Sequence, residues 1–249
     1  MLNGLFNLIR KKKPKKIEHI ETKNDKSVNT EIRNDENEKS VIQKSKLDIA
    51  SNYLFLGEYQ KAIIEVDNIL KNNNRKLQLD ALKIKGFSFY RMNEFSQSEK
   101  IFSEIATETN LPADLGNFAQ SLIYNGKVEK GIETFEKALS LIKDDKSKIK
   151  TESYLIFDYY SSLIFLKKYE KAFEQFKLLS EVYKSYSITD TMFLMMRNIP
   201  TFNTFIDLSL ELYKNEKFKI KTEIEFEKIK SKIDKYGKEY IEMKIKNAT

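Results

Sequence analysis

Residues with the chemistry for catalysis or metal binding are few in this sequence of 249 residues. The one histidine, His19, has no second histidine and no group of carboxylates at metal-ligand spacing beside it. The chain has no cysteine, which excludes thiol nucleophiles, disulfides and cysteine-bound metals. It also lacks a glycine-rich phosphate loop and the G-x-S-x-G and H-E-x-x-H motifs. Because catalysis needs titratable or nucleophilic groups that converge, we expect no enzyme activity, no catalytic residue, no cofactor and no metal site.

The net charge of +7 is concentrated at the two ends of the chain. Residues 1–46 carry 12 Lys and Arg against 7 Asp and Glu, and residues 217–249 carry 10 against 6. Residues 47–216 are close to neutral, with 22 basic and 24 acidic side chains. A nucleic-acid-binding body would carry its own basic surface, so nucleic acid is not an expected partner.

The N-terminal residues have the pattern of a weak membrane-surface anchor. Four apolar residues at helical spacing are followed directly by cations: Leu2, Leu5, Phe6, Ile9, Arg10, Lys11, Lys12 and Lys13. The apolar side would enter the lipid boundary and the cations would meet anionic headgroups. The alternative is a solvated start to a flexible arm, because so short a helix is marginal in water. The cations follow the apolar run, so we expect no secretory signal, and no segment is long enough to span a membrane.

Residues 17–40 are dense in charged and amide side chains without a sustained apolar period, which predicts a disordered linker. We therefore divide the chain into a basic amphipathic start plus linker (1–42), a repeat body (43–214) and a charged C-terminal segment (215–249). We expect a cytoplasmic protein, with the inner membrane surface as its location if the N-terminal residues anchor it.

The repeat body is recognised from one pattern that occurs four times. A small residue follows a turn in each of the passages FLGEYQKAIIEVDNIL, RMNEFSQSEKIFSEIA, YNGKVEKGIETFEKAL and FLKKYEKAFEQFKLLS, at Ala62, Ser98, Gly131 and Ala172. These residues are 36, 33 and 41 positions apart. Each has an apolar residue three positions before it and another four after it, and Ala50, Gly86 and Ala119 are small residues twelve positions before the first three. The pattern predicts pairs of antiparallel helices that cross closely.

This pattern resembles the tetratricopeptide repeat family over about Gln43 to Tyr186, and Pro112 ends the second unit as a proline often does in that family. The resemblance implies an all-α, right-handed solenoid of about four to five helix-turn-helix repeats. Two features depart from it. Tyr160 stands where the fourth unit needs a small residue, which predicts a shifted register or a loosened pair. Extra residues around Lys143 to Lys150 predict a preceding helix that is longer by about two turns.

The segments after the fourth unit leave alternatives open. Two apolar-periodic segments separated near Pro200 predict a degenerate fifth pair that caps the stack. Its methionines (Met192, Met195 and Met196) predict either an adaptable binding surface or, as is more usual, core filling. For residues 215–249 we favour one long charged helix, because Phe226, Ile229 and Ile233 follow helical spacing. The alternation from Phe218 to Phe226 supports a small β appendage instead, and Gly237 would end a shorter helix.

In this family the first helix of each pair faces a concave groove, so the resemblance implies a set of partner-binding residues there. In chain order they are Asp80, Lys83, Phe87, Tyr90, Arg91, Asn117, Gln120, Tyr124, Tyr154, Phe157, Asp158 and Ser161. Aromatic rings mixed with both charge signs suit a peptide or helix of another protein. Some family members clamp a C-terminal carboxylate with Lys and Asn; Lys83 fits, but Phe87 stands in place of the Asn, so we expect no such clamp.

The expected function is that of a non-enzymatic adapter or scaffold that binds a partner peptide or helix in the groove. A dedicated inhibitor, such as an immunity protein that neutralises a toxin, is the first alternative. A regulator that responds to a peptide or another signal is the second. The sequence does not name a partner for any of the three.

Overall fold

The computed structural model describes residues 44–248 apart from residues 72 and 148. The predictions for the membrane-contact residues, His19 and the linker therefore lie outside the described residues. In the described ranges every regular element is a helix and none is a strand, which confirms the all-α class. The chain divides into two compact units, one that extends to Thr107 and one that starts at Glu108.

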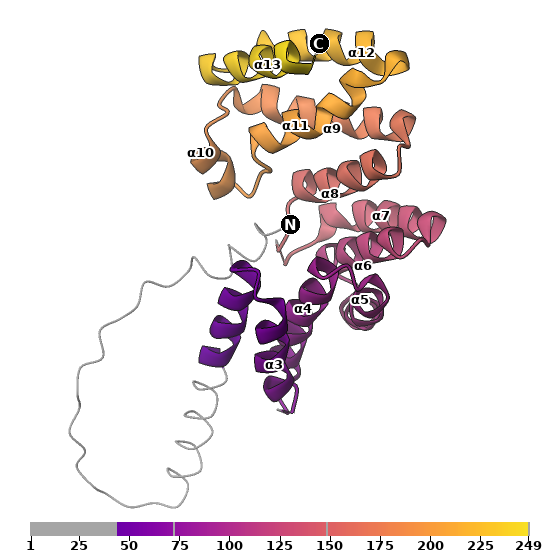
Figure 1. The fold of residues 1–249 in the computed structure, drawn as a ribbon, viewed down its shortest axis with the longest axis vertical. Helices are drawn as coiled ribbons and strands as arrows, with labels where there is room; N and C mark the ends of the chain where they lie inside the picture. Colours follow the sequence, from indigo (N-terminus) through magenta and orange to yellow (C-terminus); the bar gives the residue numbers. More distant parts are fainter. Residues whose placement is uncertain (1–43, 72, 148, 249) are drawn as a thin grey trace, which may run out of the picture. The chain divides into compact units, whose positions relative to one another are not determined.

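The first unit contains consecutive helices that share one apolar core (Figure 1). After a helix that ends at residue 55 come α3 (Tyr59–Ile69), α4 (Arg75–Arg91) and most of α5 (Phe95–Thr109). Ala50 from the first helix, Val66 from α3 and Ile84 from α4 belong to the same buried cluster. A Cβ atom on Gly86 would lie 2.9 Å from the ring of Phe102, so glycine is required where α4 and α5 approach each other.

The second unit is a stack in which each helix packs mainly against its neighbours in the sequence (Figure 1). Its elements are α6 (Pro112–Tyr124), α7 (Val128–Leu141), the 3-10 turn η1 (Ile142–Asp144), α8 (Glu152–Phe165), α9 (Tyr169–Tyr186), α10 (Thr191–Met196), α11 (Phe202–Lys214), α12 (Glu216–Lys230) and α13 (Lys235–Ala248). Helix α6 packs against α7 and α8, α8 against α9, and α11 against α12 and α13. This sequential packing is consistent with an α-solenoid.

The small residues of the repeat lie where the sequence predicts them. The second helix of each pair (α3, α5, α7 and α9) begins three residues before the small residue, and Ala62, Ser98 and Ala172 are fully buried. Gly131 is buried too, and a Cβ atom on it would lie 2.5 Å from Cγ1 of Ile123 in α6. The requirement for small residues is therefore steric, since the two helices of a pair leave no room for a larger side chain.

The turns inside the four pairs share one backbone geometry. The residue five positions before each small residue is left-handed, with φ of 80° at Gly57, 62° at Asn93, 82° at Gly126 and 55° at Lys167. The next residue donates its N–H to the carbonyl oxygen five positions earlier, at 2.8 to 2.9 Å in all four turns. Such a bond satisfies a helix-end carbonyl that would otherwise lack a donor. Asn198 repeats this geometry after α10, with φ of 55°.

The extra residues before the fourth pair do not lengthen the preceding helix, so that prediction was wrong. Helix α7 ends at Leu141, and η1 and an irregular connection follow. In this connection the side chain of Asp145 accepts hydrogen bonds from the backbone N–H and the hydroxyl of Ser147, at 2.8 and 2.7 Å. Local bonds of this kind compete with helical hydrogen bonding. Thr151 then caps α8 by accepting the N–H of Tyr154.

The fourth pair accommodates a large residue, Tyr160, where the other pairs have a small one. Its side chain is fully buried, and its hydroxyl donates to Oγ of Ser209 in α11 at 3.0 Å. The ring lies 6.4 Å from Phe176 and 6.3 Å from Phe205. Phe176 in turn stacks on Phe205 at 5.4 Å and meets Phe226 edge-on at 5.8 Å. These rings form the core that joins the fourth pair to the helices after it.

The C-terminal segment differs from both predictions made for it. It is neither one long helix nor a β appendage, because a turn at residues 231–234 separates α12 from α13. Asp234 fixes this turn by accepting the N–H and the hydroxyl of Thr189, at 2.7 and 2.6 Å, and the N–H of Gly237 at 2.9 Å. Gly237 does not end a helix; it lies in the first turn of α13, where a Cβ atom would be 2.7 Å from Thr189.

Candidate functional site

The predicted groove residues of the first unit lie on α4, and two of them pack within the unit. Phe87 meets the ring of Phe102 edge-on at 5.0 Å, and Tyr90 meets Phe95 at 5.6 Å. Both rings are half-buried. Of the charged candidates, Asp80 and Lys83 are half-buried as well, and Arg91 is exposed. Among the predicted groove residues of α4, Arg91 is therefore the most accessible.

In the second unit the predicted groove residues lie on α6 and α8, which pack against each other. Most of them are buried: Asn117, Gln120, Tyr154, Phe157 and Asp158. Tyr124 and Ser161 are half-buried. Only these last two present an accessible side chain on this part of the predicted surface.

A buried polar cluster explains the position of two predicted residues and includes one that the sequence analysis missed. Lys150, from the connection before α8, forms an ion pair with Asp158, and its ammonium group lies 3.5 Å from Oδ1 of Asn117. The side chains of Lys150 and Asp158 are only 12% and 4% exposed. A buried charge is stable only when it is paired, so this cluster ties the connection to α6 and α8. The structure thus gives Asn117 and Asp158 a partner inside the unit.

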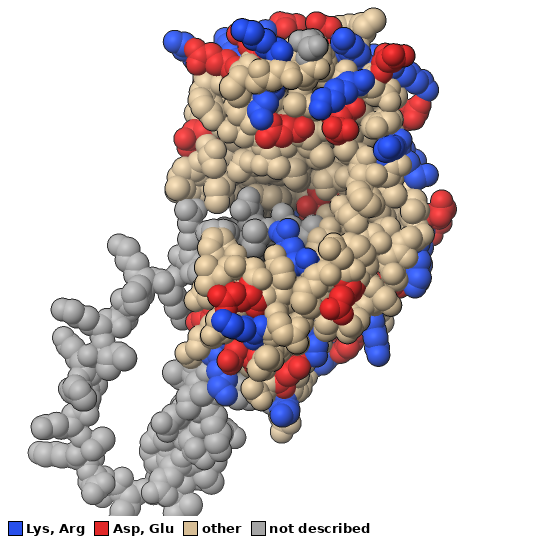
Figure 2. Space-filling model, in the orientation of Figure 1, with Lys and Arg blue, Asp and Glu red and all other residues tan. Residues whose placement is uncertain are grey.

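Helix α10 also carries exposed apolar side chains. Met192 and Met196 are 51% and 71% exposed, so the more usual interpretation of these methionines as core residues is wrong for them, while Met195 is half-buried. Tyr186 and Ile188, just before α10, are also exposed. Figure 2 shows the surface over α10 as largely uncharged, whereas α12 and α13 carry mixed charges.

Several contacts fix the position of α10. Leu194 is fully buried, and Asp190 caps the helix by accepting the N–H of Phe193 at 2.7 Å. The guanidinium of Arg197 lies 3.6 Å from the centroid of the Phe193 ring, close enough for a cation–π interaction. Thr189 is anchored to Asp234 as described above. The exposed methionines therefore project from a short helix that is tied down at both ends.

A pocket of about 350 Å³ lies beside α10, lined by Asp190, Thr191, Asp234 and Tyr236. Burial alone would raise the pKa of Asp234, but the hydrogen bonds from Thr189 and Gly237 outweigh burial and lower it. Asp234 is therefore ionised near neutral pH, and both of its oxygens accept hydrogen bonds within the protein. The hydroxyl of Tyr236 accepts a hydrogen bond from Asn203 at 2.9 Å. This arrangement supports the turn between α12 and α13.

Metal-ligating side chains do not cluster among the described residues. No three His, Cys, Asp or Glu side chains among them gather closely enough to hold a metal ion. Burial raises the pKa values of Tyr159, Tyr160 and Tyr183, so these phenols stay protonated near neutral pH. Across the described ranges, no helix has the length and apolar character needed to cross a membrane.

No protein-family model, curated protein or solved structure matches the chain.

Proposed function

We propose that the chain is a non-catalytic helical-repeat protein of the tetratricopeptide type that binds another protein, and that α10 is a principal contact surface. The observation that carries this proposal is the exposure of Met192 and Met196 on a short, well-anchored helix. Methionine has a flexible and polarizable side chain, which adapts to the apolar surface of a partner. Contiguous exposed apolar residues on a folded protein are typical of interaction sites.

The energetic gain from covering this surface is large enough to matter for affinity. Burial of one methionine side chain contributes about 1.5–3 kcal/mol, so two of them supply a substantial part of a micromolar binding energy of about 8 kcal/mol. In this proposal the buried candidates of α6 and α8 shape the repeat and do not touch the partner.

Capture of partners from a lysate of the source cells tests the proposal. The full-length protein is compared with Met192→Asp/Met196→Asp and with the matched control Ile220→Asp, and bound proteins are identified by mass spectrometry. Ile220 is 70% exposed, like Met196, but lies on α12. We expect the control to retain a partner that the double variant loses, while circular dichroism shows all three equally folded. Equal recovery by all three proteins would refute the role of α10.

A truncated form that begins at Val41 separates the contribution of the N-terminal residues in the same experiment. If the repeat body alone binds the partner, the truncated form recovers it as well as the full-length protein does. Loss of every partner on truncation would place the contact in residues 1–40 and overturn the proposal.

A further inference from the structure

Two aromatic rings meet at the edge of the second unit where α6 and α8 end. Tyr124 is the last residue of α6 and Phe165 the last of α8, and their ring centroids are 4.5 Å apart. Phe165 is 58% exposed although it is a large apolar residue. A ring that stays in water beside a second ring offers a preformed flat surface for another apolar side chain.

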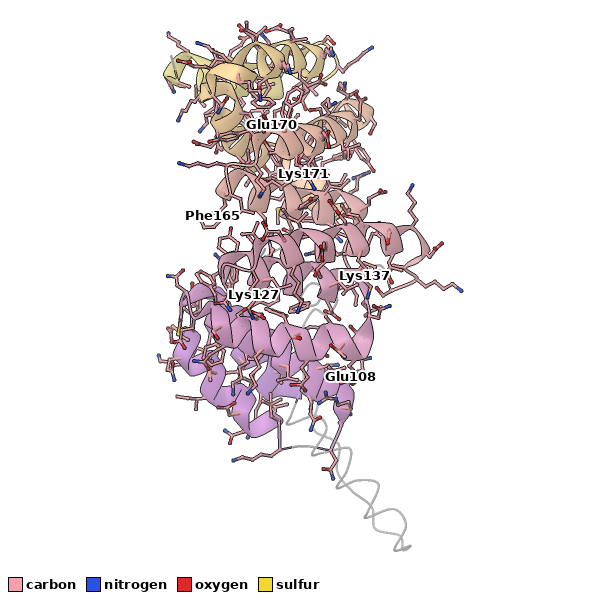
Figure 3. The ribbon with its side chains drawn as sticks, turned by 90° about the vertical axis from the view of Figure 1, so that its right-hand side faces the viewer. Glu108, Lys127, Lys137, Phe165, Glu170 and Lys171 are labelled. Carbon is pink, nitrogen blue, oxygen red and sulfur yellow. The ribbon has the colours of Figure 1, made fainter. Side chains whose placement is uncertain are left out.

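Lysines follow both rings closely. Lys127 comes three residues after Tyr124, and Lys167 and Lys168 come two and three residues after Phe165. The N–H of Lys127 donates to Leu122 and the N–H of Lys168 to Leu163, both at 2.9 Å. These bonds hold the backbone of each lysine against the last helical turn, which carries the ring. Figure 3 labels Phe165 and Lys127 on the side of the protein that faces the viewer.

The lysines after Phe165 can form ion pairs with a partner. In the part of the chain that the structure describes, neither Lys167 nor Lys168 forms an ion pair, and both are exposed. Two carboxylates of the adjoining helices are already occupied: Glu170 pairs with Lys217 and Glu136 with Lys171. Lys167 and Lys168 therefore add two positive charges next to the exposed ring of Phe165.

We propose that this edge, formed by Tyr124, Phe165, Lys167 and Lys168, binds an acidic segment of a partner protein that carries an aromatic or aliphatic side chain. The apolar side chain packs on the exposed ring of Phe165, and flanking carboxylates pair with the lysines. Exposed ion pairs contribute little energy each, so the ring supplies affinity while the lysines select an acidic sequence and orient it. The site is separate from α10, and this proposal does not depend on the function proposed for α10.

An acidic protein segment fits this edge better than a nucleic acid does. Residues 47–216 carry 22 basic and 24 acidic side chains, so a long polyanion gains no attraction from the rest of the body. The rings form a single pair, whereas a bound single strand uses successive stacking positions along a basic groove.

The test uses fluorescence anisotropy with a labelled random copolymer of Glu and Tyr as a probe of acidic, aromatic sequence. The basic run at residues 10–16 would bind any acidic polymer, so its cations are replaced by Gln in the full-length protein used throughout. Into this background we place Phe165→Ala and Lys167→Gln/Lys168→Gln. The matched controls are Tyr236→Ala, at an aromatic residue 52% exposed on α13, and Lys232→Gln/Lys235→Gln, at two exposed lysines of the same turn region.

We expect each site variant to weaken copolymer binding about tenfold and each control to change it less than about twofold. Poly-Glu, which lacks rings, should bind more weakly than the copolymer. Equal affinity of site variants and controls would overturn the proposal. The proposal would also be overturned if oligo(dT) bound more tightly than the copolymer and the site variants abolished that binding, because the edge would then bind nucleic acid. Met192→Asp/Met196→Asp should leave copolymer binding unchanged; its loss in that variant would place the probe on α10 and refute the site.

Discussion

Gly131→Ala is a sharp test of the fold because two physical effects of this substitution have opposite signs. In a helix interior, alanine is more favourable than glycine by about 1 kcal/mol, so helix propensity alone predicts a more stable protein. The structure predicts the reverse. A Cβ atom at this position would lie 2.5 Å from Cγ1 of Ile123, 3.0 Å from the carbonyl oxygen of Ala119 and 3.2 Å from the backbone nitrogen of Ile123.

The size of the effect follows from the kind of atoms involved. Two of these three contacts are backbone atoms of α6, which cannot rotate away, so α6 and α7 must move apart. Overpacking of this kind costs about 1–3 kcal/mol, and at its upper end it exceeds the propensity gain. We expect Gly131→Ala to lower the free energy of unfolding by up to about 2 kcal/mol, the difference between these two effects.

Urea titration followed by circular dichroism at 222 nm measures this free energy. The control is a pair of variants at Glu133, an exposed position of the same helix: the difference between Glu133→Ala and Glu133→Gly isolates helix propensity. If Gly131→Ala stabilises the protein by as much as that difference, the close approach of α6 and α7 is not real and the explanation for the small residues fails.

Three further predictions follow from the buried groups. Lys150→Met leaves the carboxylate of Asp158 buried without its cation and should cost about 3 kcal/mol, measured by chemical denaturation; a change below about 1 kcal/mol would contradict a buried pair. Asp234→Asn should lower the free energy of unfolding at neutral pH, because the folded state lowers the pKa of Asp234. The contribution of the carboxylate is present above the unfolded-state pKa of about 4 and is lost as the pH falls through the lowered folded-state pKa. The wild-type protein and the variant should therefore have the same stability in acid, as measured by unfolding experiments at several pH values. Phe176→Ala should cost about 3–5 kcal/mol in urea, whereas Phe165→Ala, at an exposed ring, should cost less than about 1 kcal/mol; equal losses would contradict the assignment of the core.

The repeat could be predicted from the sequence because its cause is local and steric. A small residue at the crossing of two helices, with apolar residues three before and four after it, defines a helix pair without knowledge of other pairs. The left-handed turn residues could be predicted at three of the four positions. Gly57, Asn93 and Gly126 are residue types that favour left-handed backbone, but Lys167 adopts the same geometry without such a signal.

Alternation in the C-terminal segment suggested a β appendage as the alternative because two periodicities share positions. In α12 the buried residues Phe218, Thr222 and Phe226 are four apart, which suits both a strand face and a helix face. Ile220 and Ile224 are exposed in the helix, and only tertiary packing decides between the two structures.

The candidate site was harder to predict than the fold because its contacts join distant parts of the sequence. Asn117 was expected to face a partner, but it lies 33 positions before Lys150, which approaches it only when α6 and α8 pack. The partner, the concave groove and the repeat family remain proposals that rest on the resemblance and on the exposed surfaces.

The left-handed backbone of Lys167 couples stability to recognition in a way that protein engineers can use. A non-glycine residue in this conformation is strained by about 1–2 kcal/mol. Glycine would remove this strain, but its greater freedom in the unfolded chain would cancel part of the gain in stability. Lys167→Gly is thus a stabilising substitution of about 0.5–1 kcal/mol that also removes one charge from the edge next to Phe165. Asn93→Gly offers a smaller relief in the first unit, because asparagine tolerates left-handed backbone better than lysine does, but it causes no loss of charge. A thermostabilised form that retains recognition should therefore change Asn93 and keep Lys167, since these turns share a geometry but differ in what each side chain presents to solvent.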